Sequence, residues 1–294
     1  MTFPDQRTEM IEIAMLHHVK RTRRTDIGPL SDYAVTPSEL ESYLLDRQEW
    51  TPVSTLTEVG QNDGTCLLPT FDDGYRNNVT EALPVLEKHE IPCLLFITTG
   101  FIDGTAYPYE LELAEILEQA DTLSLPDRSE PVELHDMSER RALYRELRLP
   151  LKPVPPSERD VFMDQVARLN DYDRAEMQKE PMLDWDDVRT LSEHPLVTIG
   201  AHTKSHVLLS HQSWRTAWEE IRSSKEQLEQ QIRQPVRHFS YPYGGNDVVV
   251  RQMVRWAGFR YGFTTQANRA EHVTMWNRFS LPRIDIGELL PDHA

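Results

Sequence analysis

Short apolar runs alternate with longer amphipathic stretches along most of the chain, a pattern that predicts a parallel α/β sheet or barrel. Strands are expected at residues 11–16, 66–71, 93–98, 197–200, 236–241 and 260–264. Helices are expected between them, among others at 36–50, 78–89 and 214–232. The first of these helices begins with a capping box, Thr36 and Glu39, with Pro37 at the first helical position.

Two features interrupt this pattern. Residues 102–180 are charged, mostly helical in pattern and broken by Pro150, Pro153, Pro155 and Pro156. We interpret them as a helical insertion within a single domain of residues 1–294, although a small subdomain or a lid would fit equally well. Pro69 lies inside a predicted strand, where a β-bulge would accommodate its missing N–H group.

Charge and composition restrict the partners. The formal net charge of −17, from 31 basic and 48 acidic side chains, argues against nucleic acids and anionic membranes. No run reaches the ~20 apolar residues of a transmembrane helix, and residues 1–10 lack the pattern of a secretory signal. Cys66 and Cys93 lie in strand-like runs and are expected to be buried free thiols. These features predict a cytoplasmic protein.

Two adjacent carboxylates, Asp72 and Asp73, directly follow the predicted strand 66–71. The carboxyl end of a parallel strand is where active-site groups gather, and like charges there usually serve a metal or a catalytic step. Because aspartate and glycine are also common turn residues, Asp72-Asp73-Gly74 could equally be a polar turn.

A histidine pair follows the predicted strand 197–200. His202 and His206 are four residues apart, so a helix or turn would place both imidazoles on one face, as in divalent metal sites. A chance pair is plausible among 11 histidines, but its occurrence with two strand-end aspartates favours a metal site. Two histidines and one carboxylate leave coordination positions open, which is typical of a hydrolase.

Three segments resemble, in order, motifs of the polysaccharide deacetylases of carbohydrate esterase family 4. They are Thr70-Phe71-Asp72-Asp73-Gly74, His202-Thr203-Lys204-Ser205-His206 and Phe239-Ser240-Tyr241-Pro242-Tyr243-Gly244-Gly245. The opening Met15-Leu16-His17-His18-Val19 resembles that of the circularly permuted bacterial members. The resemblance covers about residues 11–286, apart from the insertion. It implies a distorted (β/α)7-type barrel whose helical insertion covers the mouth at the carboxyl ends of the strands.

The resemblance also implies the chemistry. Asp73, His202 and His206 would hold a divalent metal, usually zinc, with cobalt or nickel tolerated. Asp72 would be the general base, and the backbone N–H of Tyr243 would stabilise the oxyanion. The implied reaction removes the N-acetyl group from an amino sugar of a surface polysaccharide or its precursor, with an N-acetylated saccharide as substrate.

The sequence departs from the family at two positions. Ser240 stands where an arginine usually orients the base; Arg283 could replace that arginine, or could form a surface or interdomain ion pair. The usual C-terminal histidine acid is missing, and His17 of the first strand takes its place unless it is an ordinary core histidine. His18 and His272 are weaker candidates.

Two alternatives stay open. Relatives of this fold remove formyl groups from lipid-linked amino sugars or hydrolyse other amides, and the motifs do not separate acyl sizes. The two departures are also compatible with a catalytically weak, metal-binding partner in polysaccharide synthesis. The sequence leaves the oligomeric state open.

Overall fold

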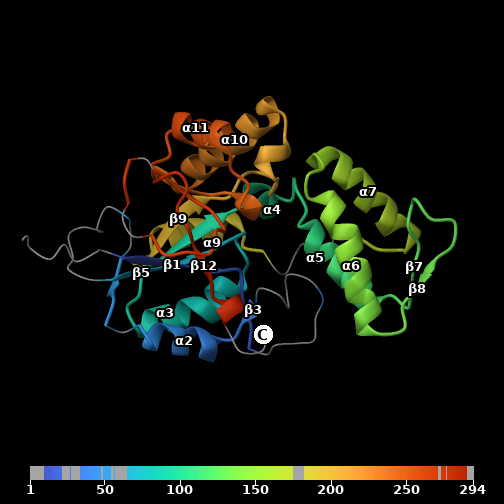
Figure 1. Ribbon diagram of the computed structural model, residues 1–294, viewed down its shortest axis with the longest axis horizontal. Coiled ribbons are helices and arrows are strands. Elements are labelled where there is room, and N and C mark those ends of the chain that lie inside the picture. Colours follow the sequence, from blue (N-terminus) through green and yellow to red (C-terminus); the bar gives the residue numbers. More distant parts are fainter. Residues whose placement is uncertain are drawn as a thin grey trace, which may run out of the picture.

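The computed structural model describes residues 10–21, 27, 34–47, 49–53, 56, 65–174, 182–270, 273–275 and 277–289. Its main sheet is parallel, curls into a half-barrel and has the strand order β11-β10-β9-β6-β5-β1-β12 (Figure 1). The strands are β1 (Ile11–Leu16), β5 (Cys66–Phe71), β6 (Cys93–Ile97), β9 (Val197–Ala201), β10 (His238–Ser240), β11 (Tyr261–Phe263) and β12 (Ile284–Asp285). The predicted barrel-type α/β fold is confirmed.

The strands are buried on both faces, which explains why they appear in the sequence as continuous apolar runs. The last segment of the chain links the two edges of the sheet. Leu281 forms a parallel bridge with Phe263 of β11, and β12 then pairs with β1. The six strands expected from apolar runs do not include β12, because two residues are too few to show a periodic pattern.

Pro69 is accommodated without a bulge. The register between β1 and β5 is continuous, so the bulge suggested by the sequence is wrong. The N–H groups of Cys66 and Asp72 point toward the β1 side. Strand alternation therefore turns the nitrogen of Pro69 toward the other edge, where pairing passes from β4 (Thr51–Pro52) to β6. No ladder bond is lost there.

Helices cover the outside of the sheet (Figure 1). They are α2 (Pro37–Leu45), η1 (Asn78–Ala82), α3 (Leu83–Lys88), α4 (Thr99–Asp103), α9 (Trp185–Ser192), α10 (Trp214–Ile232) and α11 (Val248–Trp256). The predicted helix 78–89 is divided into η1, a π-helix, and α3. Pro84 lacks an N–H group for the α-helical ladder, and the N–H of Leu83 instead bonds five residues back, to Asn78.

Three helices form a separate lobe beside the barrel, at the right of Figure 1. This α5–α7 segment contains α5 (Tyr109–Gln119), α6 (Met137–Leu151) and α7 (Pro156–Leu169), with a hairpin of β7 (Thr122–Leu123) and β8 (Val132–Glu133) after α5. It buries an apolar cluster of its own, with Leu113, Leu117 and Met163 at its centre. This region lies within the insertion expected at 102–180.

The remaining short elements are β2 (His18–Val19), which pairs with β3 (Ala34–Val35), and the 3-10 turns η2 (Leu209–His211), η3 (Pro242–Gly244) and η4 (Gly287–Leu289). Cys66 and Cys93 are buried and are not joined in a disulfide bond, as expected. In the part of the chain that the structure describes, every helix is too short or too polar to cross a bilayer.

Candidate active site

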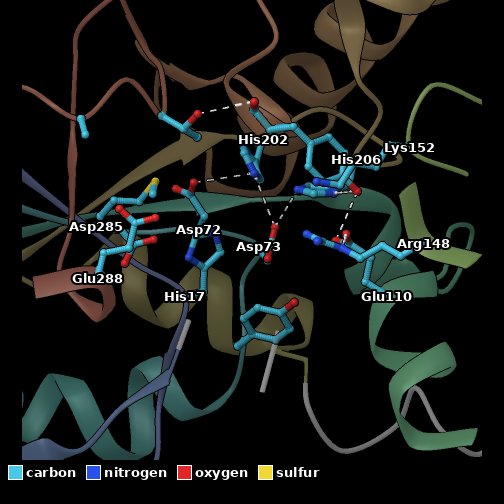
Figure 2. Close-up of a pocket in the computed structure, with 15 residues that line it drawn as sticks. His17, Asp72, Asp73, Glu110, Arg148, Lys152, His202, His206, Asp285 and Glu288 are labelled. Carbon is cyan, nitrogen blue, oxygen red and sulfur yellow. Dashed lines mark hydrogen bonds and ion pairs between the residues drawn. The ribbon is translucent and has the colours of Figure 1, made fainter. Parts of the chain in front are cut away.

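One pocket of about 270 Å³ lies at the carboxyl ends of β1, β5 and β9 (Figure 2). It is lined by all the site residues expected from the sequence except Arg283, namely His17, Asp72, Asp73, His202, His206 and Tyr243. The carboxyl ends of parallel strands meet at one edge of a barrel. Motifs that are far apart in the sequence therefore converge here.

Asp73, His202 and His206 point toward one another in Figure 2. Oδ1 of Asp73 lies 3.2 Å from Nε2 of His206 and 3.5 Å from Nε2 of His202. The three atoms that could serve as ligands lie within 4.8 Å of one another, a spacing that a single ion can span. Zinc is commonly bound by this kind of donor set, and three protein ligands leave a position for substrate or water.

The turn after β5 presents Asp73 to this cluster. The φ angles of Asp73 and Gly74 are 76° and 91°, two consecutive left-handed residues. Gly74 fits because a Cβ atom at this φ angle is strained and would lie 3.1 Å from the Ile97 side chain. The sequence Asp-Asp-Gly is thus both a turn and part of the site.

The loop that carries the two histidines is fixed from outside the barrel. Glu220, buried on α10, accepts hydrogen bonds from the backbone N–H groups of Lys204 (3.0 Å) and Ser205 (2.8 Å). Thr203 and His206 have φ angles of 64° and 50°, in the left-handed region. Such backbone strain is typical of functional sites, where the surrounding structure holds it in place.

The protonation pattern fits a cation between the three side chains. Nδ1 of His202 lies 2.9 Å from the carbonyl oxygen of Ser240, so Nδ1 carries the proton and Nε2 presents a lone pair to Asp73. Among the described residues, no donor reaches Oδ1 of Asp73. Burial, and then the charge of Asp72, raise the pKa of Asp73 well above its usual range. A metal ion would satisfy these converging lone pairs.

Asp72 forms a fully buried, bidentate ion pair with Arg283, which the structure places behind the pocket wall. Nη1 and Nη2 of Arg283 lie 2.8 and 2.7 Å from Oδ1 and Oδ2 of Asp72. Nη2 also donates to Oγ of Ser240 at 2.9 Å, and Ser240 donates to Oδ2 of Asp72 at 3.2 Å. Arg283, which directly precedes β12, therefore contacts Asp72 inside the protein, and a surface ion pair is excluded.

This contact sets the charge of Asp72. Burial on its own raises the pKa of Asp72, but the charges of Arg283 and His202 hold it well below its usual range. The carboxylate is thus ionised at neutral pH and rigidly oriented, although both partners are buried.

His17 lines the pocket on the side of Asp72, whereas His18 points elsewhere and packs on the ring of Tyr75 with 3.8 Å between centroids. Asn78 donates to the backbone oxygen of His17 at 2.7 Å and fixes the end of β1. Burial lowers the pKa of His17 to about 4, an effect that the charge of Asp72 opposes. His272 lies outside the described residues.

Five further charged residues of the pocket were not predicted. Glu110, Arg148 and Lys152 come from the α5–α7 segment, and Asp285 and Glu288 lie at or after β12. Glu110 and Arg148 form an ion pair, and Nζ of Lys152 lies 4.6 Å from the centre of the Tyr243 ring. No local motif marks the first three, because their position depends on how the segment packs beside the barrel.

Comparison with known proteins identifies the family of the chain. The family model of polysaccharide deacetylases matches residues 60–146 and 157–262, more than half of the chain. No curated protein matches the sequence.

Several solved structures share the fold. The Streptococcus pyogenes deacetylase PplD, solved in complex with acetate, is 16% identical with a TM-score of 0.59, covering 94% of this chain and 91% of PplD. A de-N-acetylase from Aggregatibacter actinomycetemcomitans is 14% identical with a TM-score of 0.61, covering 97% and 98%. The polysaccharide deacetylase BC0361 from Bacillus cereus is 15% identical with a TM-score of 0.58; the match covers 95% of this chain but only 65% of BC0361.

These likenesses establish a common fold. The family match spans the three motifs and supports a hydrolase that acts on amide bonds of polysaccharides. The circular permutation indicated by the opening segment stays a prediction. The chain belongs to the polysaccharide deacetylase family.

Proposed function

We propose that this protein is a metal-dependent hydrolase that removes the N-acetyl group from an amino sugar of a surface polysaccharide or its precursor. The observation that carries the proposal is the pairing of two neighbouring carboxylates with different environments. Asp73 faces two imidazole lone pairs, whereas Asp72 is held ionised by Arg283. One carboxylate is thus suited to bind a metal and the other to accept a proton.

Asp73, His202 and His206 would hold the metal, for which zinc is our first candidate and cobalt or nickel are alternatives. When bound, such an ion polarises the amide carbonyl and makes water a better nucleophile at neutral pH. The protein supplies the remaining functions from groups that line the same pocket.

Asp72 is the proposed general base, which takes a proton as water attacks the amide carbon. The backbone N–H of Tyr243 is proposed to donate to the developing oxyanion. His17 is proposed to give a proton to the leaving nitrogen. Because its pKa is about 4, His17 rests neutral, and the proton that it donates has to reach it during the reaction, with Asp72 as the proposed source.

The arrangement argues against a catalytically weak metal-binding partner. That alternative rested on the missing third-motif arginine and the missing C-terminal histidine. Arg283 contacts Asp72 directly, and His17 lines the metal pocket, so a residue is present for each proposed task.

The test of the proposed function is product release from saccharides. Purified protein loaded with zinc or cobalt should release acetate from N-acetylglucosamine oligomers, measured by a coupled acetate assay. N-formylated analogues separate a deacetylase from a deformylase by the acyl group that is released. Protein that binds metal but releases neither acetate nor formate from a panel of such saccharides would contradict the proposal.

Replacing His17 with glutamine should lower kcat for amide hydrolysis by about 10²-fold, as expected for loss of a general acid. An ester such as 4-nitrophenyl acetate has a leaving group that departs without protonation, so its hydrolysis should change much less. Metal affinity serves as the control and should not change. Equal losses on amide and ester would show that His17 does not protonate the leaving group.

A further inference from the structure

The α5–α7 segment reaches the second histidine of the candidate metal site through a side-chain relay (Figure 2). The hydroxyl oxygen of Tyr243 lies 3.2 Å from Nδ1 of His206 and 3.3 Å from Oε2 of Glu110. Glu110 belongs to the first turn of α5, and its other oxygen is paired with Arg148 of α6. Two helices of the segment therefore contribute to a chain of contacts that ends at His206.

The chemistry of these groups fixes the direction of each hydrogen bond. A carboxylate only accepts, so the Tyr243 hydroxyl donates to Glu110 and keeps its lone pairs for the Nδ1–H group of His206. Nε2 of His206 is then left without a proton, and this atom faces Asp73 at 3.2 Å. A tyrosine hydroxyl carries its proton at neutral pH, so it can serve as the donor to Glu110.

The surroundings favour a fixed geometry. Glu110 and Arg148 are each only 13% exposed, so their ion pair is largely shielded from water. A second contact from the same segment lies next to His206: Nη2 of the buried Arg159 on α7 donates to the backbone oxygen of Ser205 at 3.0 Å. The segment thus contacts the loop before His206 directly, through Arg159, and reaches the ring of His206 through Tyr243.

We propose that Glu110 is a positioning residue for His206, acting through the Tyr243 hydroxyl, so that the α5–α7 segment forms part of the metal site. His202 is oriented differently, by a backbone carbonyl of the barrel itself. The inference rests on the proposed metal site. If the inference is correct, the segment influences metal affinity even in the absence of substrate. A segment that only covered the pocket would not have this effect.

The experiment measures Co²⁺ binding to the full-length, chelator-stripped protein by titration, with the visible absorption of the bound ion as a second readout. Glu110→Gln and Tyr243→Phe should each weaken binding by about 10-fold to 100-fold, as for other groups that orient metal-binding histidines. The Co²⁺ affinity of the double variant should lie within about 2-fold of that of the weaker-binding single variant, because both changes break the same relay. Glu115→Gln, on the same helix but outside the pocket, is the matched control and should bind as the wild type does.

The outcomes separate this inference from the proposed function. The relay would be overturned if Glu110→Gln bound Co²⁺ within 2-fold of the wild-type affinity. It would also be overturned if the losses of affinity in the two single variants multiplied in the double variant. A wild-type protein that does not bind Co²⁺ would instead overturn the metal site itself. If Glu110→Gln does not fold, Tyr243→Phe, which removes one hydroxyl and leaves the backbone N–H in place, tests the same link.

Discussion

Replacing Asp72 with asparagine is expected to lower kcat for acetate release by about 10³-fold, the size of effect typical of a lost general base. The asparagine amide has nearly the shape of the carboxylate but cannot accept the proton from water. Its neighbour Asp73, and not Asp72, is the residue that faces both histidine Nε2 atoms at 3.2–3.5 Å. Metal binding by the Asp72→Asn variant should therefore stay at one ion per chain.

Acetate release and metal content are measured on the same samples. Glu288→Gln is the matched control, since it also removes a pocket carboxylate, at the exposed rim, and should change kcat by only a few-fold. Loss of the metal from the Asp72→Asn variant would make Asp72 a ligand, and full activity would remove it from the mechanism.

Replacing Arg283 with glutamine is expected to affect both stability and turnover. Arg283 is fully buried and makes two bonds to Asp72, at 2.8 and 2.7 Å. Its loss leaves a buried carboxylate without a charged partner, which typically costs about 3–5 kcal/mol of unfolding free energy. Because Asp72 then loses its fixed orientation, kcat should fall by about 10²-fold while KM changes little.

A double-mutant cycle in metal-free protein tests whether the loss of stability comes from the Arg283–Asp72 ion pair. Adding Arg283→Gln to the Asp72→Asn variant should cost less than adding it to the wild type, because no buried carboxylate is left unpaired. Arg283→Lys keeps the charge but only part of the bidentate contact, so its kcat should lie between those of the wild type and Arg283→Gln. If the two substitutions lower the free energy of unfolding additively, Arg283 stabilises the fold independently of Asp72.

The barrel and the motif residues were predictable because both depend on local sequence. Strand-length apolar runs gave the boundaries of β1 and β5, and the polar residues after the strands had to meet at one edge of the sheet. The sequence left two roles open for Arg283, a partner that orients the base and a surface or interdomain ion pair. The buried bidentate contact with Asp72 favours the first. The division of the helix at 78–89 had a visible signal in Pro84, which breaks the helical ladder from inside.

The contribution of the α5–α7 segment could not be predicted. Glu110 is one of several acidic residues on an amphipathic helix, and no spacing distinguishes it from Glu115. Its place in the pocket follows from tertiary packing, which brings α5 and α6 against the mouth of the barrel. The same holds for Lys152, which lies beyond the last residue of α6 and reaches the Tyr243 ring.

The most direct test of the account is to measure acetate release from an N-acetylglucosamine oligomer while metal is removed from the wild-type protein and then restored. We expect activity to disappear with chelation, to return in proportion to added zinc or cobalt, and to reach its plateau at one ion per chain. Acetate release that continues in fully chelated protein, or a metal-saturated protein that releases none, would contradict the proposal that Asp73, His202 and His206 form the catalytic metal centre.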